Sequence, residues 1–178
     1  MTTRFAPFAR LLHWTMAALI LAMLFIGAGM VSTASGRYPA LLAWHRPIGI
    51  AILVLALVRL GFRLTHRPPP LPGDLPDWQK AAATASHWLL YALMIAMPLI
   101  GWAMQSTGGY PVQLTKTLVL PPILPYDIQL YGLLRRLHGL LAYAFFLLIL
   151  GHLGAALSHA LIRRDGVFQS MAGGALRD

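Results

Sequence analysis

Histidine is the side chain in this 178-residue sequence best suited to chemistry, because seven histidines are present and cysteine is absent. Neutral imidazole binds iron, copper and zinc, whereas a chain without cysteine can hold neither an iron–sulfur cluster nor a covalently attached c-type haem. Six histidines lie in or at the ends of long apolar segments, where a polar side chain is costly: His13, His45, His87, His138, His152 and His159. Any one of them alone could be an ordinary interfacial histidine, but their spacing indicates a non-covalent cofactor site inside a membrane.

The spacing of His138 and His152 is the most informative feature of this set. The two residues are fourteen positions apart in one apolar segment, so on a helix they share a face and lie about 21 Å apart along the axis. An electron-transfer haem takes two strong axial ligands, and imidazole suits iron. One helix could therefore serve two haems stacked across the bilayer, and each haem needs a partner histidine from another helix.

Depth in the bilayer selects those partners. His13 begins the first apolar segment and His45 begins the second, so the two residues lie at opposite membrane faces. We predict that His13 and His152 hold an inner haem iron, and that His45 and His138 hold an outer haem iron.

Four apolar segments must position these residues. The chain is 58% hydrophobic and 11% charged, with a mean hydropathy of +0.66, which is typical of a protein whose solvent is lipid. Each segment is long enough for a membrane-spanning helix, and the first is read as a span rather than as a signal peptide. We expect an all-α membrane protein with one domain over residues 1–178, a four-transmembrane-helix bundle with two b haems between its helices. The spans are expected at about 11–31, 41–64, 81–104 and 137–162, with a proline-rich loop near 66–76 and an irregular loop over 105–136.

Basic residues indicate the orientation. Lys and Arg outnumber Asp and Glu by 14 to 5, and they flank the apolar segments, which favours membrane headgroups over nucleic acid as their partners. Nine lie on the side of both termini and five on the other side, so both termini are expected in the cytoplasm of a multi-pass protein of the bacterial inner membrane. The outer five are Arg37, Arg46, Lys116, Arg135 and Arg136.

The histidines also stand in recognisable local sequences. These are LLHW around His13, WHRPIG around His45, SHWLLY around His87, LHG around His138 and GH at His152. With these motifs the chain resembles, over essentially its whole length, the prokaryotic cytochrome b561 family, and more distantly the cytochrome b subunits of membrane formate dehydrogenases and hydrogenases. The resemblance implies a di-haem b protein whose fourth helix ligates both haems.

His87 leaves an alternative open. It lies one turn into the third span at the depth of the inner haem, so it could replace His13 or His152 as a ligand. More simply, it contacts a haem propionate or a quinone carbonyl.

His159 is a candidate for a quinone site. It lies seven residues after His152, on nearly the same face and closer to the cytoplasm, with Arg10 or Arg163 expected nearby. A quinone headgroup needs a hydrogen-bond donor within reach of an electron source and of water. An ordinary interfacial histidine explains the same position equally well.

Arginines beside the histidines could pair with haem propionates. Arg135, Arg136 and Arg46 lie next to the outer ligands, and Arg59 and Arg63 could act in the same way at the inner haem. Contact with lipid headgroups is the simpler explanation for each one alone. As a set, the outer basic residues would also attract a small anion.

Together these features predict electron transfer through two b haems between a periplasmic donor and ubiquinone. The family that the chain resembles includes a superoxide oxidase, which implies an oxidoreductase whose donor is superoxide, although a redox protein is another possible donor. One alternative is an anchor subunit that relays electrons for a larger dehydrogenase or hydrogenase complex. Another is a transporter or scaffold whose histidines carry protons or zinc, but no Asp or Glu lies in the spans to assist them.

Overall fold

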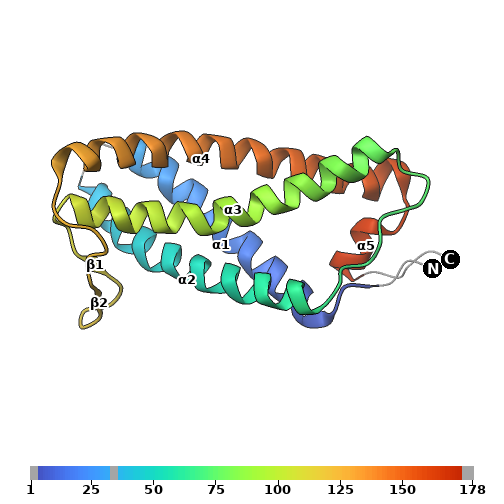
Figure 1. Ribbon diagram of the computed structural model, residues 1–178, viewed down its shortest axis with the longest axis horizontal. Coiled ribbons are helices and arrows are strands. Elements are labelled where there is room, and N and C mark those ends of the chain that lie inside the picture. Colours follow the sequence, from blue (N-terminus) through green and yellow to red (C-terminus); the bar gives the residue numbers. More distant parts are fainter. Residues whose placement is uncertain (1–3, 33–35, 174–178) are drawn as a thin grey trace.

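Four long helices form the protein, as the sequence predicts (Figure 1). The computed structural model describes residues 4–32 and 36–173. The long helices are α1 (Pro7–Ser32), α2 (Arg37–Thr65), α3 (Asp77–Thr107) and α4 (Ile128–Leu157). A π-helical turn, η1 (Ser158–Arg163), extends α4, and a short helix, α5 (Val167–Ala172), and two short strands, β1 (Val112–Gln113) and β2 (Val119–Leu120), complete the described elements.

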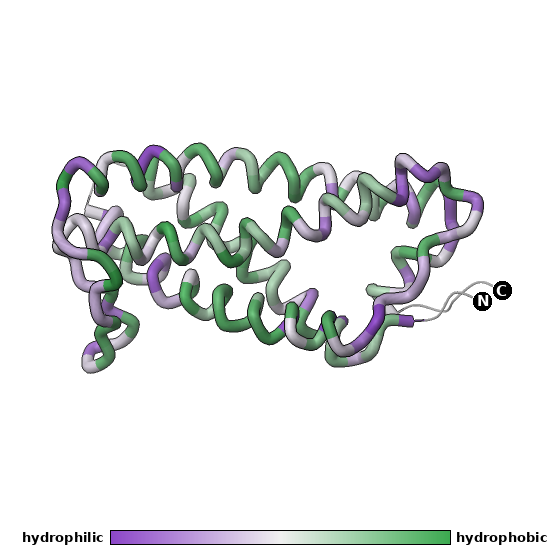
Figure 2. Tube along the Cα trace, in the orientation of Figure 1, coloured by the Kyte–Doolittle hydropathy of each residue, from purple (hydrophilic) through white to green (hydrophobic). Residues whose placement is uncertain are grey.

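Each long helix has the length and composition of a membrane span, with η1 counted as the end of the fourth. Large apolar side chains cover the outside of the bundle: Phe25 is 79% exposed and Leu140 is 68% exposed. Figure 2 shows the apolar stretches of the helices between more hydrophilic connections at both ends. Such a surface is stable in lipid and not in water, and the protein is therefore a multi-pass membrane protein.

The interior of the bundle is small and lies near the middle of the helices. Met16 of α1 and Ala56 of α2 are almost inaccessible, and Tyr91, Met94 and Phe145 pack with them. The small side chain of Ala56 allows the neighbouring helices to approach closely. This core holds the helices in register along the bundle.

The bundle has two distinct ends. At one end, here called the terminal end, α1 and α3 begin, α2 and η1 finish, and α5 lies. At the other, the hairpin end, β1 and β2 pair in antiparallel register with Val112 opposite Leu120. Both described ends of the chain lie at the terminal end (Figure 1).

The fourth helix begins earlier than the sequence analysis predicts. It starts at Ile128 rather than near residue 137, so the expected loop over 105–136 is too long. Asp127 causes the difference, because its carboxylate accepts hydrogen bonds from the backbone N–H groups of Gln129 (2.9 Å) and Leu130 (3.0 Å) and so caps the helix. Arg135 and Arg136 therefore lie within α4 and not before it.

The segment between α3 and α4 is tied to the end of α3. The Trp102 indole donates to the Pro121 carbonyl (2.9 Å), and the Ile123 N–H donates to the Ser106 hydroxyl (3.1 Å). The Asp127 N–H donates to the Thr107 carbonyl (3.0 Å). These hydrogen bonds fix the hairpin segment against the bundle end.

We predict that Gly108→Ala destabilises the hairpin end. A Cβ at Gly108 would lie 2.7 Å from Tyr110 Cδ2 and 2.8 Å from Tyr131 Cδ2, so both rings must shift, at a cost of about 1–3 kcal/mol. Thermal unfolding in detergent should show a lower Tm than for the unmodified protein. The matched control is Gly132→Ala in α4, where a Cβ meets nothing within 4 Å; equal Tm values for the two variants would contradict the prediction.

Candidate functional site

Two pairs of histidine rings face each other, one pair near each end of the bundle. The ring centroids of His45 on α2 and His138 on α4 are 6.2 Å apart, and those of His13 on α1 and His152 on α4 are 6.3 Å apart. A metal ion held by two imidazole nitrogens at about 2 Å each puts the ring centroids about 6 Å apart. Each pair therefore has the spacing that a single bridging metal ion requires.

The rings of each pair meet across the least closely packed part of the bundle. Among the described helices, close backbone packing joins α1 to α2, α2 to α3, and α3 to α4, whereas α4 makes little such contact with α1 or α2. The paired histidines reach from α4 to α1 and α2. A flat cofactor could lie between helices that are kept apart in this way.

The pair at the hairpin end fits a ligand-binding role. Nδ1 of His45 is buried and has no hydrogen-bond partner among the described residues, and such an orphan in a folded protein calls for an explanation. A Cβ at Gly101 of α3 would lie 3.4 Å from Cε1 of His138. Glycine at this position therefore lets α3 pass close to the ring.

The pair at the terminal end has an additional partner. Arg59 of α2 lies with Nη2 3.0 Å from Nδ1 of His13. Because guanidinium groups only donate, Nδ1 of His13 is the acceptor in this contact. A metal ion at Nε2 of the neutral ring would require the proton on Nδ1 instead, and Arg59 would then need another acceptor.

A third histidine joins the terminal-end pair. The ring centroids of His87 on α3 and His152 are 5.6 Å apart. The His152 ring is thus about equally close to the rings of His13 and His87. Either residue could share a metal ion with His152, as the sequence analysis allows.

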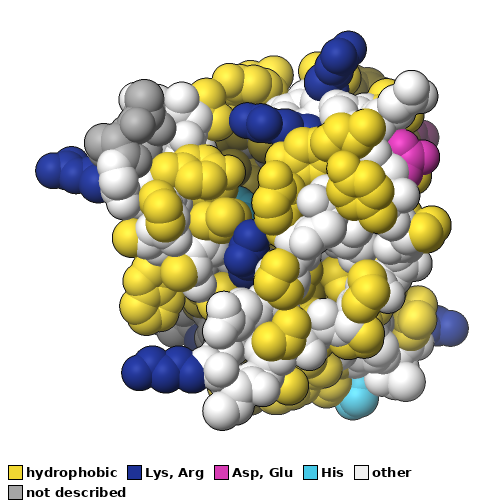
Figure 3. Space-filling model, turned by 90° about the vertical axis from the view of Figure 1, so that its left-hand side faces the viewer, with side chains coloured by type: hydrophobic (Ala, Val, Ile, Leu, Met, Phe, Trp, Pro, Cys, Tyr) yellow, Lys and Arg dark blue, Asp and Glu magenta, His cyan; other side chains and the backbone are white. Residues whose placement is uncertain are grey.

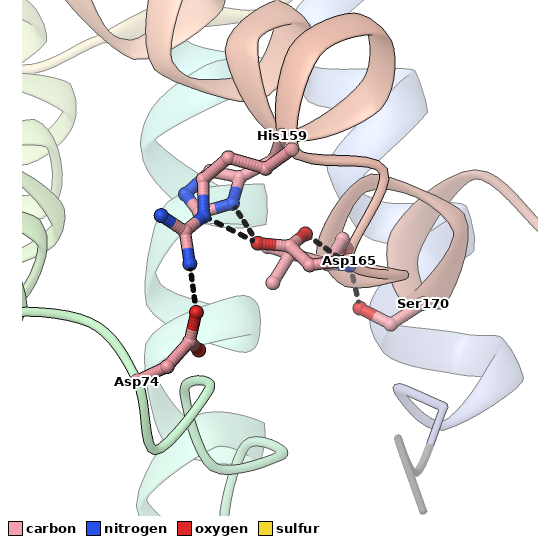
Figure 4. Close-up of polar contacts among 6 residues, drawn as sticks. Asp74, His159, Asp165 and Ser170 are labelled. Carbon is pink, nitrogen blue, oxygen red and sulfur yellow. Dashed lines mark hydrogen bonds and ion pairs between the residues drawn. The ribbon is translucent and has the colours of Figure 1, made fainter.

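His159 lies in a polar network that the sequence analysis did not identify (Figure 4). Its Nδ1 lies 2.6 Å from Oδ2 of Asp165, and Arg163 Nε donates to the same oxygen at 3.1 Å. Arg163 Nη2 also donates to Asp74 in the proline-rich loop. An ionised carboxylate only accepts, so Nδ1 of His159 donates this hydrogen bond.

The network holds Asp165 in its ionised form. Burial opposes ionisation, but the hydrogen bonds from His159, the Val167 N–H and Arg163 outweigh it and lower the pKa of Asp165 below its ordinary value. Asp165 also starts α5, because Oδ1 accepts from the Val167 N–H at 3.2 Å. One carboxylate thus links η1 to α5.

Arg10 has partners other than His159. Its Nε donates to the Met171 carbonyl (3.2 Å), and the Trp14 indole donates to the same carbonyl (3.3 Å). These bonds join α1 to the end of α5. Of the two arginines expected beside His159, Arg163 shares its carboxylate partner and Arg10 bonds to α5.

The basic residues predicted for the outer face share the hairpin end. Arg135, Arg136 and Lys116 are exposed, and Arg46 donates through Nη2 to Gln105 Oε1 at 2.6 Å. Figure 3 views this end of the molecule and shows Lys and Arg side chains over a largely hydrophobic surface, with acidic atoms only at one edge. The visible charge on this face is mainly positive.

Comparison with known proteins gives consistent matches over the chain. The family described as prokaryotic cytochrome b561 matches residues 4–174. The chain is 29% identical over 171 residues to cytochrome b561 homolog 1 of Escherichia coli K12 (94% of this chain, 96% of that protein) and 28% identical over 173 residues to homolog 2 (96% and 92%). It is 32% identical over 127 residues to a probable superoxide oxidase, CybB, of Yersinia pestis (71% and 72%).

We predict that acid weakens the contact between η1 and α5 through Asp165. Because the pKa of Asp165 is lowered by folding, its stabilising contribution is complete above the ordinary carboxyl pKa of about 4 and is lost as the pH falls through the folded-state pKa. Between about pH 5 and 3, the Tm of the unmodified protein in detergent should fall more steeply than that of Asp165→Asn. Asp77→Asn, at a fully exposed carboxylate, should follow the unmodified protein; parallel slopes for all three proteins would refute the role of Asp165.

Proposed function

Because this chain belongs to the prokaryotic cytochrome b561 family, we propose that it carries electrons through two b-type haems from a periplasmic donor to ubiquinone. Family membership makes it a haem b membrane protein that transfers electrons, an oxidoreductase in the broad sense. Our proposal adds the number of haems, their ligands, the donor and the acceptor. It also places the protein in the bacterial inner membrane, with both termini on the cytoplasmic side and the hairpin end on the periplasmic side.

The two facing histidine pairs are the observation that carries this proposal. We assign His45 and His138 to the outer haem, and His13 and His152 to the inner haem. The supporting evidence is the 6.2 Å and 6.3 Å separation of the ring centroids, together with the wider spacing of α4 from α1 and α2. When bound, a bis-imidazole haem supplies a one-electron carrier without an open position for oxygen.

The protein's part is to hold the ligands and exclude water. α4 fixes the two levels about 21 Å apart, because fourteen residues of helix separate His138 from His152. Phe145 lies between these levels and is buried with Met16 and Met94. A dry centre of this kind keeps the electron path away from water.

Superoxide is the donor that best fits the hairpin end. The exposed basic side chains of Arg135, Arg136 and Lys116 attract a small anion to this end, and the Yersinia pestis relative is named as a probable superoxide oxidase. Each superoxide would give up one electron and become dioxygen. Two such electrons with two protons from the cytoplasm would convert ubiquinone to ubiquinol.

His159 is proposed as the proton-donating contact for the quinone. Asp165 accepts from Nδ1 and so orients the ring; Nε2 would take up a proton from cytoplasmic water, form the imidazolium, and then give that proton to the reduced quinone oxygen. Arg163 shares Asp165 and keeps the carboxylate in place. Arg10 lies at the same end and donates to the Met171 carbonyl of α5, so it supports α5 rather than His159.

We predict that His138→Ala removes the outer haem and retains the inner one. The measurement is a dithionite-reduced minus oxidised spectrum with haem quantified per polypeptide, expected to fall from two haems to one. His66→Ala is the matched control, because His66 is an exposed histidine outside both pairs, stacked on Phe62. Equal haem content in His138→Ala and His66→Ala would refute the assignment.

The same measurement decides between His13 and His87. Loss of the inner haem in His13→Ala, with two haems retained in His87→Ala, would support our assignment. The reverse pattern would make His87 the ligand of the inner haem. A single haem in the unmodified protein would refute the two-level arrangement.

We predict that His159→Ala slows ubiquinone reduction by about 100-fold or more and leaves the haem spectra unchanged. The assay supplies superoxide and a soluble ubiquinone analogue to purified protein, and follows haem reduction and ubiquinol formation separately. Haem reduction by superoxide should be as fast as in the unmodified protein and in His66→Ala. Failure of superoxide to reduce the haem would remove superoxide as donor, whereas normal ubiquinol formation in His159→Ala would remove the role of His159.

A further inference from the structure

A basic pocket of about 300 Å³ opens at the terminal end. It lies between the residues preceding α1, the end of α2, the proline-rich loop and Tyr91 of α3. Its lining includes five side chains that carry or can carry positive charge and no carboxylate: Arg4, Arg59, Arg63, His66 and Arg67.

The described carboxylates all have partners outside this pocket. The chain contains five acidic residues, all Asp, and four are in the described part. Asp74 and Asp165 bond to Arg163, Asp77 pairs with Lys80, and Asp127 caps α4. Among the described residues, no carboxylate therefore pairs with Arg59, Arg63 or Arg67.

Aromatic rings hold the deeper arginines in place without neutralising them. The guanidinium carbon of Arg63 lies 5.4 Å from the ring centroid of Trp88 and 5.6 Å from that of Tyr91. Arg59 lies 5.8 Å from the Tyr91 centroid and contacts His13. Both side chains are half-buried, and charges that are taken out of water require pairing to be stable.

The rest of the lining is apolar and stiff. It includes Phe5, Phe62, Met171 and the prolines at 68–70, and the His66 ring stacks on Phe62 with centroids 3.9 Å apart and planes 7° apart. α2 ends at Thr65, so the pocket lies where this span leaves the bilayer. Lipid phosphates lie at that depth, with glycerol and acyl groups beside them.

We propose that this pocket binds the phosphate of an anionic membrane-lipid headgroup, with Arg63 and Arg67 as its main donors. Guanidinium groups bind phosphate through charge-assisted, often bidentate hydrogen bonds. The apolar wall favours the glycerol part of a lipid over free phosphate. This inference does not depend on the electron donor, and Arg67, which lies outside both histidine pairs, tests it separately from the proposed haem ligands.

The test uses the full-length holoprotein in phosphatidylcholine nanodiscs that contain a minor fraction of phosphatidylglycerol. Native mass spectrometry then measures the phosphatidylglycerol retained per protein. Arg67→Gln and Arg63→Gln should each lower retention about five- to tenfold, since one basic residue contributes about 1 kcal/mol to anionic-lipid binding. The control is Arg164→Gln, because Arg164 is exposed at the same end, lies outside the pocket and donates to the Leu161 carbonyl.

Two results would overturn the proposal. The first is equal retention in Arg67→Gln, Arg164→Gln and the unmodified protein. The second is occupation of the pocket by inorganic phosphate added to pure phosphatidylcholine discs, without displacement by phosphatidylglycerol. Haem per polypeptide is measured on the same samples. If Arg63→Gln also loses haem, its lower lipid retention has a second cause, and the result for Arg67→Gln alone decides whether the pocket binds lipid.

Discussion

The position of two imidazoles on one face of α4 is the constraint on which the rest of the structure depends. Fourteen residues between His138 and His152 put the rings almost four turns apart, at two levels of the bundle. Polar rings in hydrocarbon need partners, and the partners come from α2 at one level and from α1 and α3 at the other. The order of the helices follows from this requirement, because α1 and α2 run in opposite directions and each presents one histidine near its start at the level where α4 needs it.

Charge sets a second constraint, and it differs between the ends. At the hairpin end the basic residues are mostly exposed on the surface, with Arg46 held by the neutral oxygen of Gln105. At the terminal end Asp165 and Asp74 bind Arg163. Arg59 and Arg63 instead lie against aromatic rings, beside a pocket whose lining contains no carboxylate. Among the described residues, carboxylates neutralise Arg163 but none pairs with Arg59 or Arg63, which is why we propose an external anion for the second site.

The sequence was sufficient for the helices and for the levels of the histidines, because hydropathy and a period of 3.6 residues are properties of local sequence. It was insufficient where a single capping residue fixes the start of a helix, or where a change from α-helix to π-helix redirects the backbone. Asp127 extends α4 back to Ile128, and an Asp before an apolar run was the signal for this start. The contact of His159 with Asp165 depends on the π-helical turn and on a left-handed backbone at Arg164 (φ 52°) and Gly166 (φ 81°), which turn the chain back on itself. Glycine at 166 is a signal for a positive φ, but arginine at 164 gives no such signal.

Hydrogen bonding at His13 connects the two features of the terminal end. Arg59 donates to Nδ1 of His13, so the neutral ring carries its proton on Nε2 in this arrangement. An iron at Nε2 requires the proton on Nδ1 instead. Nδ1–H and the Arg59 guanidinium are then both donors, so they cannot hydrogen-bond to each other. Arg59 has a side-chain hydrogen bond with Tyr91 and also lines the basic pocket, so an anionic group in or beside that pocket, a haem propionate or a lipid phosphate, would give it a second acceptor. If both of our proposals hold, ligation of iron by His13 and an anion at the terminal end favour each other, because the anion replaces the acceptor that Arg59 loses when Nδ1 of His13 is protonated.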